Sequence, residues 1–381
     1  MQVRISLATG ALILFAVQGS GGASLPSDRP MQAARVQAVL DHHADDYLGD
    51  PCRAGISIAA LIGGRTYYAN RGVADRGTRT PPTSNSVYEL ASVTKTFAGA
   101  LAARAVIDGR MTLDGDFRRH LPRSYPNLSK MGSPITLRTL ATHTAGLQRD
   151  LPDSDPLFAK LDHDRIGAQL AELNKGYGRT RSLHDLHFVK LRSVPGATFA
   201  YSNLGMRVIG YGLETIYRQP MAQIIQRDLL TPLGMASTRF QPDASMRRRL
   251  VTPYGRSGKI EPLHDGSAGL AYGLYSTPRD MARYLAWHLN DGDLVVARSH
   301  ALLRGTARDG QGLIWNIGDD HGRRLLWHGG GSFGETSQMV LFPDQRQGYV
   351  LLANDACEGS EAAMKQLAIS LAAALREHGR R

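Results

Sequence analysis

The stretch SVYELASVTKTFAGALAARAVIDG, residues 86–109, combines the pattern of a buried helix with a reactive pair of side chains. Apolar residues recur every four positions along it, at Val93, Phe97, Leu101 and Ala105. This spacing lines up one face of a helix, so that face is expected to pack against a hydrophobic core. Gly109 is placed to end the helix, because glycine readily adopts the left-handed conformation found just past a helix C-terminus.

Ser92 and Lys95 lie at the start of this predicted helix, about one turn apart, which brings the lysine amine beside the serine hydroxyl. The first N–H groups of a helix are free, so the Ser92 N–H can hold an oxyanion. A lysine kept from solvent and near other positive charges can be neutral enough to act as the base that the hydroxyl needs. The pattern therefore predicts a nucleophile with its base; taken alone, it also fits a capping serine beside a solvated lysine.

A second motif, Tyr201-Ser202-Asn203, follows Pro195-Gly196 and begins another predicted helix, so it lies on a loop that can face a cleft. A tyrosine near a cationic lysine can have a lowered pKa and carry protons between a nucleophile and a leaving group. Asn203 can donate to a substrate carbonyl and also hold Lys95 in place. The alternative is an interfacial tyrosine with a capping asparagine.

A third motif, His328-Gly329-Gly330, ends a predicted strand. Glycines at that place let a substrate backbone lie alongside the strand edge. The next N–H, that of Gly331, is placed to be a second oxyanion donor, and His328 can face a substrate carboxylate or relay a proton. The alternative is a glycine run in a hairpin beside an ordinary histidine.

The order of the predicted elements indicates an α+β fold. A glycine pair, Gly63-Gly64, separates two strand-like runs, 55–62 and 65–72, and predicts a hairpin. In the C-terminal part we expect three more strands, at 324–328, 337–342 and 348–354, followed by a helix at 360–376. We expect one antiparallel sheet flanked by helices, formed by residues 24–121 and 250–381. An inserted all-helical lobe, residues 122–249, would then leave a cleft for the site between the two lobes.

Cys52 and Cys357 are the only cysteines, and their positions predict a disulfide. Cys52 comes just before the strand-like run 55–62, and Cys357 just after the run 348–354. If these strands pair antiparallel, the start of one faces the end of the other, and in an oxidising compartment the sulfurs should bond. Two unrelated thiols are the alternative.

Residues 1–23 have the features of a secretory signal peptide: Arg4, an apolar run of 13 residues from Ile5 to Val17, and the small residues Gly21-Gly22-Ala23. No later stretch approaches the length of a membrane span, so no stable span is expected. The predicted location is periplasmic or secreted.

The formal net charge is +11, which favours attraction to anionic envelope polymers. Nucleic acid is not an expected partner, because no basic run is interleaved with aromatic residues. A metal site is not expected either: His42-His43 and Asp45-Asp46 are adjacent on a predicted helix and point in different directions. No cofactor is predicted.

Taken together, the three motifs resemble those of the penicillin-recognising serine enzymes, the β-lactamases and penicillin-binding peptidases. Other stretches share the resemblance: LATHTAGL at 140–147, PGATFAYSN at 195–203, PLGM at 232–235 and LYSTP at 274–278. The resemblance extends from about residue 55 to residue 354. Within the family, the sequence resembles the class C β-lactamase branch and looks close to AmpH-type D-alanyl-D-alanine carboxypeptidase/endopeptidases.

The resemblance implies a β-lactamase/transpeptidase-like fold and a set of roles. Ser92 would be the acylated nucleophile, Lys95 and Tyr201 the acid–base pair, and Asn203 and Gly331 substrate-binding groups. The expected function is an exported serine hydrolase that cleaves D-Ala-D-Ala stem peptides of peptidoglycan and binds penicillin. The alternatives are a class C-like β-lactamase, an esterase of the same fold, and a non-catalytic penicillin- or peptidoglycan-binding protein.

The third motif departs from the family, in which it is usually Lys-Thr-Gly. Here a fixed cation is replaced by His328, whose ordinary pKa is near 6.5, and Gly329 brings no hydroxyl. This change argues against efficient cephalosporin hydrolysis.

Overall fold

An eight-stranded antiparallel sheet organises the molecule. The structure, a computed structural model, describes residues 28–162, 165–290 and 292–377, so the predicted signal segment 1–23 lies outside it. The strand order across the sheet is β2-β1-β12-β11-β10-β9-β8-β7. In that order the strands are Arg65–Gly72, Gly55–Ile62, Gln347–Ala353, Thr336–Phe342, Arg323–Gly331, Asn316–Asp320, Asp309–Gln311 and Arg304–Gly305.

The predicted hairpin is present as β1 and β2, with Ile62 opposite Arg65. Gly63 and Gly64 both have positive φ, +56° and +76°, the conformation that a tight two-residue hairpin turn requires. The three predicted C-terminal strands correspond to β10, β11 and β12. The sequence analysis missed β7, β8 and β9.

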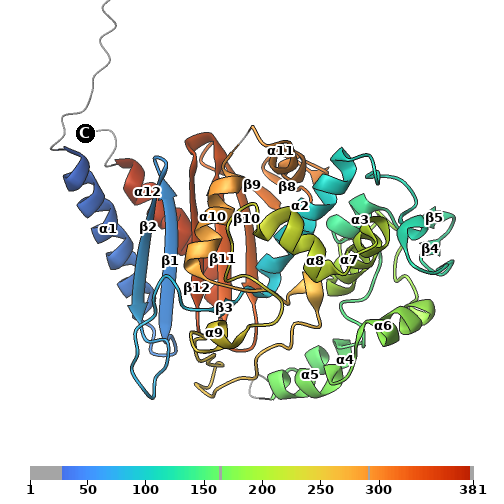
Figure 1. Cartoon of the computed structure of the whole chain (residues 1–381), viewed down its shortest axis with the longest axis horizontal. Coiled ribbons are helices and arrows are strands. Elements are labelled where there is room, and N and C mark those ends of the chain that lie inside the picture. Colours follow the sequence, from blue (N-terminus) through green and yellow to red (C-terminus); the bar gives the residue numbers. More distant parts are fainter. Residues whose placement is uncertain (1–27, 163–164, 291, 378–381) are drawn as a thin grey trace, which may run out of the picture.

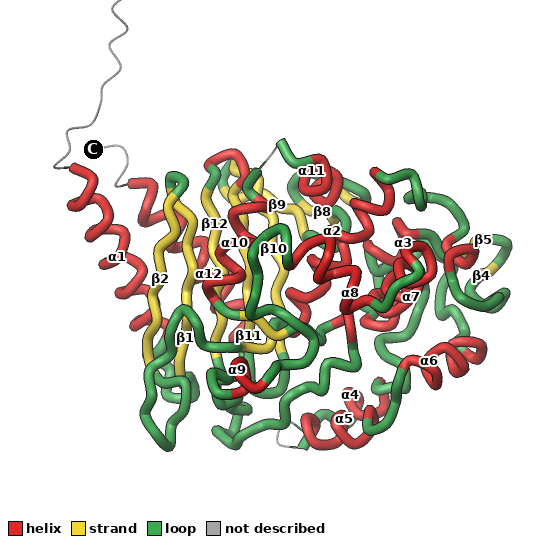
Figure 2. Tube along the Cα trace, in the orientation of Figure 1, coloured by secondary structure: helices red, strands yellow, loops and turns green. Residues whose placement is uncertain are grey.

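Helices cover both faces of the sheet (Figures 1 and 2). α1 (Asp28–Tyr47) and α12 (Ser360–Glu377) pack on one face with the side chains of Ile58, Phe342 and Leu351. On the other face lies α10 (Pro278–His288), beside a second core that includes Val350 and Leu352. Because neighbouring residues of a strand point to opposite faces, β12 supplies both layers at once. α11 (Leu294–His300) lies near the end of the sheet formed by β8 and β9.

The second lobe is built mainly of helices (Figure 1). These are α3 (Leu137–Ala141), α4 (Asp155–Ala159), α5 (Ile166–Asn174), α6 (Arg179–Asp185), α7 (Asn203–Tyr217) and α8 (Met221–Ile225). A short ribbon of β4 (Ser129–Lys130) and β5 (Ser133–Pro134) accompanies them. α9 (Ala244–Arg247) lies instead beside the sheet, where Met246 packs with Val87 and Tyr275. One hydrophobic core includes residues of both lobes, and the lobe boundaries at 121/122 and 249/250 stay a prediction.

α2 (Thr94–Ile107) passes between the sheet and the helical lobe and is buried on nearly all sides. This is more burial than the single apolar face that the sequence predicted. Small residues make it possible: a Cβ on Gly99 would lie 2.4 Å from the Leu313 carbonyl oxygen, so the chain approaches α2 there as closely as glycine allows. A helix enclosed in this way holds its first turn rigidly.

A disulfide joins Cys52 and Cys357, which are 305 residues apart in the sequence. β1 and β12 are antiparallel neighbours with Ile56 opposite Ala353, so the two cysteines flank the same end of the strand pair. The bridge links the two ends of the sheet-forming sequence. None of the described helices is long and apolar enough to span a bilayer.

Replacing both cysteines, C52S/C357S, should lower the free energy of unfolding by about 5 kcal/mol, because the unfolded variant is no longer restricted by a very long closed loop. Denaturant unfolding of the oxidised wild type and the double variant measures the difference. Reduced wild type should match the variant. Equal stability of oxidised and reduced wild type would contradict the expectation.

Candidate active site

Ser92 lies in a short 3₁₀ turn, Ala91–Val93, immediately before α2, rather than in the α-helix itself. Ala91 has a positive φ of +43°, which is uncommon for a residue with a side chain. The segment before it is fixed by β3 (Tyr88–Glu89), which pairs with β6 (Tyr275–Ser276). The nucleophile predicted from the sequence is therefore presented by a constrained turn at the head of a buried helix.

The Lys95 amine is fully buried beside the Ser92 hydroxyl. Its Nζ lies 2.9 Å from Ser92 Oγ and 2.6 Å from the backbone oxygen of Ala271. Burial is the main cause that lowers the pKa of Lys95 to about 7; the charges of Asp150 and Glu361 oppose it, and that of Arg149 acts in the same direction as burial. A large share of this lysine is thus neutral near pH 7 and can accept a proton.

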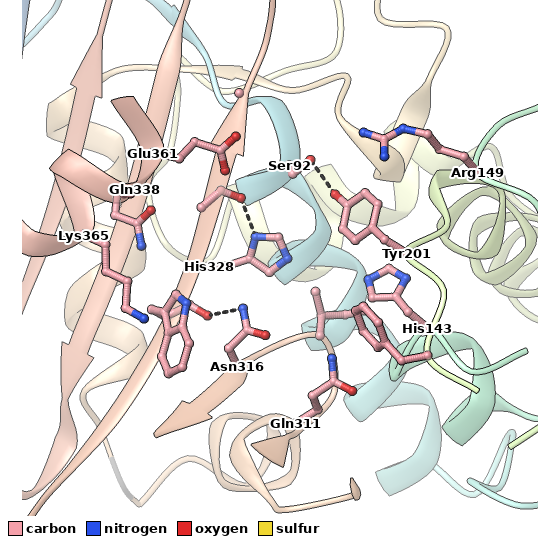
Figure 3. A pocket seen from close by; sticks show the side chains of 16 residues that line it. Ser92, His143, Arg149, Tyr201, Gln311, Asn316, His328, Gln338, Glu361 and Lys365 are labelled. Atoms are coloured by element: carbon pink, nitrogen blue, oxygen red, sulfur yellow. Dashed lines mark hydrogen bonds between the residues drawn. The ribbon is translucent and has the colours of Figure 1, made fainter. Parts of the chain in front are cut away.

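Tyr201 approaches the same oxygen from the helical lobe, with its OH 2.7 Å from Ser92 Oγ (Figure 3). Burial raises the pKa of Tyr201 to about 12, against a lowering by its hydrogen bond to Ser92. The expectation of a lowered tyrosine pKa is therefore wrong: desolvation of the phenolate outweighs the nearby positive charge. Tyr201 is a neutral phenol that can donate a hydrogen bond.

Asn203 does not hold Lys95 as the sequence analysis expected. Its Nδ2 donates to Asp150 Oδ2 at 3.3 Å, and the lysine is held instead by the Ala271 carbonyl. The Asn203 Oδ1 atom is buried and has no hydrogen-bond partner within the described structure. Binding of a substrate carbonyl by Asn203 stays a prediction.

The glycine motif lies directly against the nucleophile. A Cβ on Gly330 would be 2.7 Å from the Ser92 nitrogen, so only glycine fits there without a shift. β10 pairs with β9 only as far as Trp327, whereas its pairing with β11 continues to Gly331. The segment from His328 to Gly331 therefore has an edge that β9 does not cover.

His328 is not the cation that the sequence analysis considered. The side chain is 5% exposed, and its Nδ1 lies 2.7 Å from the Gly329 carbonyl oxygen, to which it can donate. Burial, with a smaller contribution from the nearby Lys95 charge, lowers the pKa of His328 to about 4. The ring is uncharged at neutral pH, because the site offers little water to solvate an imidazolium.

A pocket of about 380 Å³ opens at Ser92, Tyr201 and the uncovered edge of β10 (Figure 3). Three charged residues that sequence reasoning missed also line it: Arg149, Glu361 and Lys365. Glu361 and Lys365 are one turn apart on α12, whose sequence carries only an ordinary amphipathic pattern. Nothing local to that helix signals that its first turns reach the site.

Two buried carboxyl groups link the segments on either side of the site. Glu335 Oε2 accepts the backbone N–H of Glu89 at 2.8 Å, and Glu335 is 1% exposed. Glu89 is three residues before Ser92, and Glu335 is four residues after Gly331. Burial raises the pKa of Glu335 well above its usual value, and the charge of Glu89 adds to the effect.

The described residues contain no cluster of three or more histidine, cysteine, aspartate or glutamate side chains that could hold a metal ion. His42 lies 3.4 Å from Asp46, whereas His43 bonds to the Val39 carbonyl oxygen.

Comparisons with known proteins place the chain among its relatives. The family model described as Beta-lactamase matches residues 40–374. The D-alanyl-D-alanine-carboxypeptidase/endopeptidase AmpH of Escherichia coli (strain K12) is 27% identical over 287 residues, covering 75% of this chain and 69% of AmpH. Protein flp of Staphylococcus aureus (strain MRSA252) is 26% identical over 317 residues, covering 79% of this chain and 59% of flp.

Solved structures show the same fold. A β-lactamase/D-alanine carboxypeptidase from Yersinia pestis, complexed with citrate, superposes with a TM-score of 0.76 at 22% identity, over 90% of this chain and 99% of that one. A class C β-lactamase gives a TM-score of 0.74 at 19% identity, with the same coverage. The predicted β-lactamase/transpeptidase-like architecture is confirmed.

Glu335 should make stability fall as pH rises above 4.5, its usual pKa. The native carboxyl keeps its proton to a higher pH than the unfolded one, so deprotonation favours unfolding. Glu335→Gln keeps an acceptor for the Glu89 N–H but cannot titrate. Its melting temperature should therefore fall less than that of wild type between pH 6 and pH 9.

The matched control is Glu358→Gln, which removes the same charge from an exposed side chain. It should follow the wild-type pH dependence. If Glu335→Gln follows the wild type as well, Glu335 is ionised in the native state and this interpretation of the acid pair is wrong.

Proposed function

This chain belongs to the beta-lactamase family of serine hydrolases, and on that premise we propose that it is a penicillin-binding D-Ala-D-Ala carboxypeptidase/endopeptidase acting through an acyl-enzyme. One observation carries the proposal: Ser92 Oγ lies within 2.9 Å of Lys95 Nζ and 2.7 Å of the Tyr201 hydroxyl, beside an uncovered strand edge. A nucleophile, a neutral amine and a phenol thus meet where an extended peptide can lie.

In the proposed acylation step, the neutral Lys95 amine accepts the Ser92 hydroxyl proton as Oγ attacks the scissile carbonyl carbon. The backbone N–H groups of Ser92 and Gly331 are assigned to the carbonyl oxygen as it becomes negatively charged. The tetrahedral intermediate then collapses, and the C–N bond breaks. The protonated lysine supplies a proton through the Tyr201 hydroxyl to the leaving nitrogen, so the amine departs neutral.

Deacylation reverses these roles with water in place of the amine. The Tyr201–Lys95 pair takes a proton from the water as its oxygen attacks the acyl carbon, and Ser92 leaves with a proton returned to its Oγ. Because the pKa of Tyr201 is about 12, the tyrosine works as a neutral relay and Lys95 stores the charge. These roles keep the proton relay expected from the sequence but not the lowered tyrosine pKa.

Three observations support a cell-wall peptide as substrate. The uncovered edge from His328 to Gly331 suits an extended peptide chain, which can add to a strand by backbone hydrogen bonds. The N-terminal segment has the composition of an export signal, and the net charge of +11 favours an anionic polymer. The relatives include proteins named as D-alanine carboxypeptidases. We accordingly place the mature protein in the periplasm or outside the cell.

An esterase is the second candidate, and a specific observation favours it. Neutral His328 removes the fixed cation that the family usually offers at this position. The binding of a neutral ester does not depend on that cation, whereas an anionic substrate would bind more weakly without it. A β-lactamase also fits the same catalytic groups.

Digestion of purified peptidoglycan, with fragments read by mass spectrometry, tests the proposal. We expect release of D-alanine or cleavage of cross-links by the wild type and none by Ser92→Ala. Rapid hydrolysis of a chromogenic cephalosporin without peptide cleavage would make the protein a β-lactamase. Turnover of short esters alone would make it an esterase, and no adduct on Ser92 with any of these would indicate a binding protein.

The rate of Ser92 acylation should rise with pH through about 7 and then level, because only the neutral Lys95 amine can accept the serine proton. Single-turnover acylation by a neutral ester between pH 5 and pH 9 measures this. Lys95→Arg, which stays charged throughout, should reduce the rate by about 10²- to 10⁴-fold. The exposed Lys259→Arg is the control and should keep the wild-type profile. A flat wild-type profile would exclude Lys95 as the base.

A further inference from the structure

Glu361 places a carboxylate against the strand edge that the substrate would occupy. It lies in the first turn of α12 and lines the same pocket as Ser92 (Figure 3). A Cβ on Gly331 would be 2.6 Å from Glu361 Oε1, and one on Gly329 would be 3.1 Å from Oε2. The two glycines therefore leave the space that this carboxyl group fills, which gives the unusual His-Gly-Gly-Gly sequence a structural reason.

The two cationic residues that line the pocket with Glu361 contact aromatic rings and form no direct ion pair with it. Lys365, one turn further along α12, has its Nζ 3.6 Å from the centre of the Trp327 ring. The Arg149 guanidinium lies 4.5 Å from the centre of the Phe158 ring. Within the described structure, Glu361 forms no ion pair of 4.0 Å or less. Burial raises the pKa of Glu361, while the charges of Lys95 and Arg149 act in the opposite direction from a distance. An incoming substrate therefore meets a carboxyl group that lines the pocket without a directly paired cation among the described residues.

Neither His328 nor Gly329 offsets this negative charge at the uncovered edge. His328 is neutral and gives its Nδ1 to the Gly329 carbonyl, and Gly329 has no hydroxyl to donate. In a D-Ala-D-Ala terminus, the carboxylate carbon is two bonds from the scissile nitrogen, so it cannot be held far from the strand. Like charges in a partly buried site repel strongly.

We propose that Glu361 determines specificity by rejecting a substrate whose leaving group carries a carboxylate next to the scissile bond and accepting one whose leaving group is uncharged or cationic. The inference rests on the proposed peptidase function and narrows it. Among cell-wall peptides, the site would prefer amidated termini, and cross-links whose leaving amine has no carboxylate on its adjacent carbon, over a free C-terminal D-Ala. On such cross-links the enzyme would act as an endopeptidase rather than as a carboxypeptidase.

Two matched pairs of substrates test this at pH 8. The substrate carboxylate is ionised there, and the raised pKa of Glu361 calls for a pH well above the ordinary carboxyl value. The first pair is one acyl-D-Ala peptide ending in D-Ala or in D-alaninamide. The second is one aryl ester whose leaving phenol carries a carboxylate or a carboxamide. For each pair we expect the wild type to prefer the uncharged member by about 10-fold in kcat/KM.

Glu361→Gln should bring both ratios close to one by improving the carboxylate substrate, and Glu361→Lys should invert them. Glu358→Gln, which removes an equal charge from a side chain outside the pocket, should leave the ratios unchanged. Added salt should shrink the wild-type ratio, as expected for a charge effect.

The outcomes separate this inference from the proposed function. If neither peptide is cut while the ester ratios follow Glu361 as described, the peptidase assignment fails and the role of Glu361 stands. If the wild type prefers the carboxylate member of either pair, or if Glu361→Gln leaves both ratios as in wild type, the inference is overturned.

Discussion

The site depends on keeping the Lys95 amine out of water. A lysine in solvent is charged at neutral pH and cannot take a proton from serine, so a base near pH 7 must be made by burial. Here the amine is enclosed between the two lobes and touches only Ser92 Oγ and the Ala271 carbonyl oxygen among the described hydrogen-bond partners. The same enclosure raises the pKa of Tyr201 and lowers that of His328. One constraint, desolvation, thus sets the protonation state of every titratable group that touches the nucleophile or the glycine motif.

The fold keeps Lys95 away from water by holding α2 between the sheet and the helical lobe. Close backbone contacts at Gly99 and Gly330 hold the first turn of α2 against the neighbouring chain and β10. The Glu89–Glu335 contact ties the segment before the nucleophile to the segment after the glycine motif. Because these contacts come from distant parts of the sequence, the site forms only when both lobes are in place.

Much of this was predictable from local patterns. The turn glycines gave the β1–β2 hairpin, and the spacing of Ser92, Lys95 and Tyr201 identified groups that the structure brings within 3 Å of one oxygen. The strands β7 to β9 were missed because they are short or, like Asn316–Asp320, rich in residues that strands usually avoid. The charge states of Tyr201 and His328 were mispredicted because burial is a property of the assembled lobes. Glu361 was overlooked because only tertiary packing brings α12 to the site.

The titration of Lys95 tests the account most directly. The chain has only seven lysines, so NMR of protein labelled at the lysine side-chain carbon and nitrogen can resolve them, with Lys95→Met giving the assignment. The account predicts one resonance, absent from the variant, that titrates with a pKa near 7 in the folded protein. If the Lys95 resonance instead titrates near the ordinary lysine value of about 10.4, the amine is charged at neutral pH and Ser92 has no base.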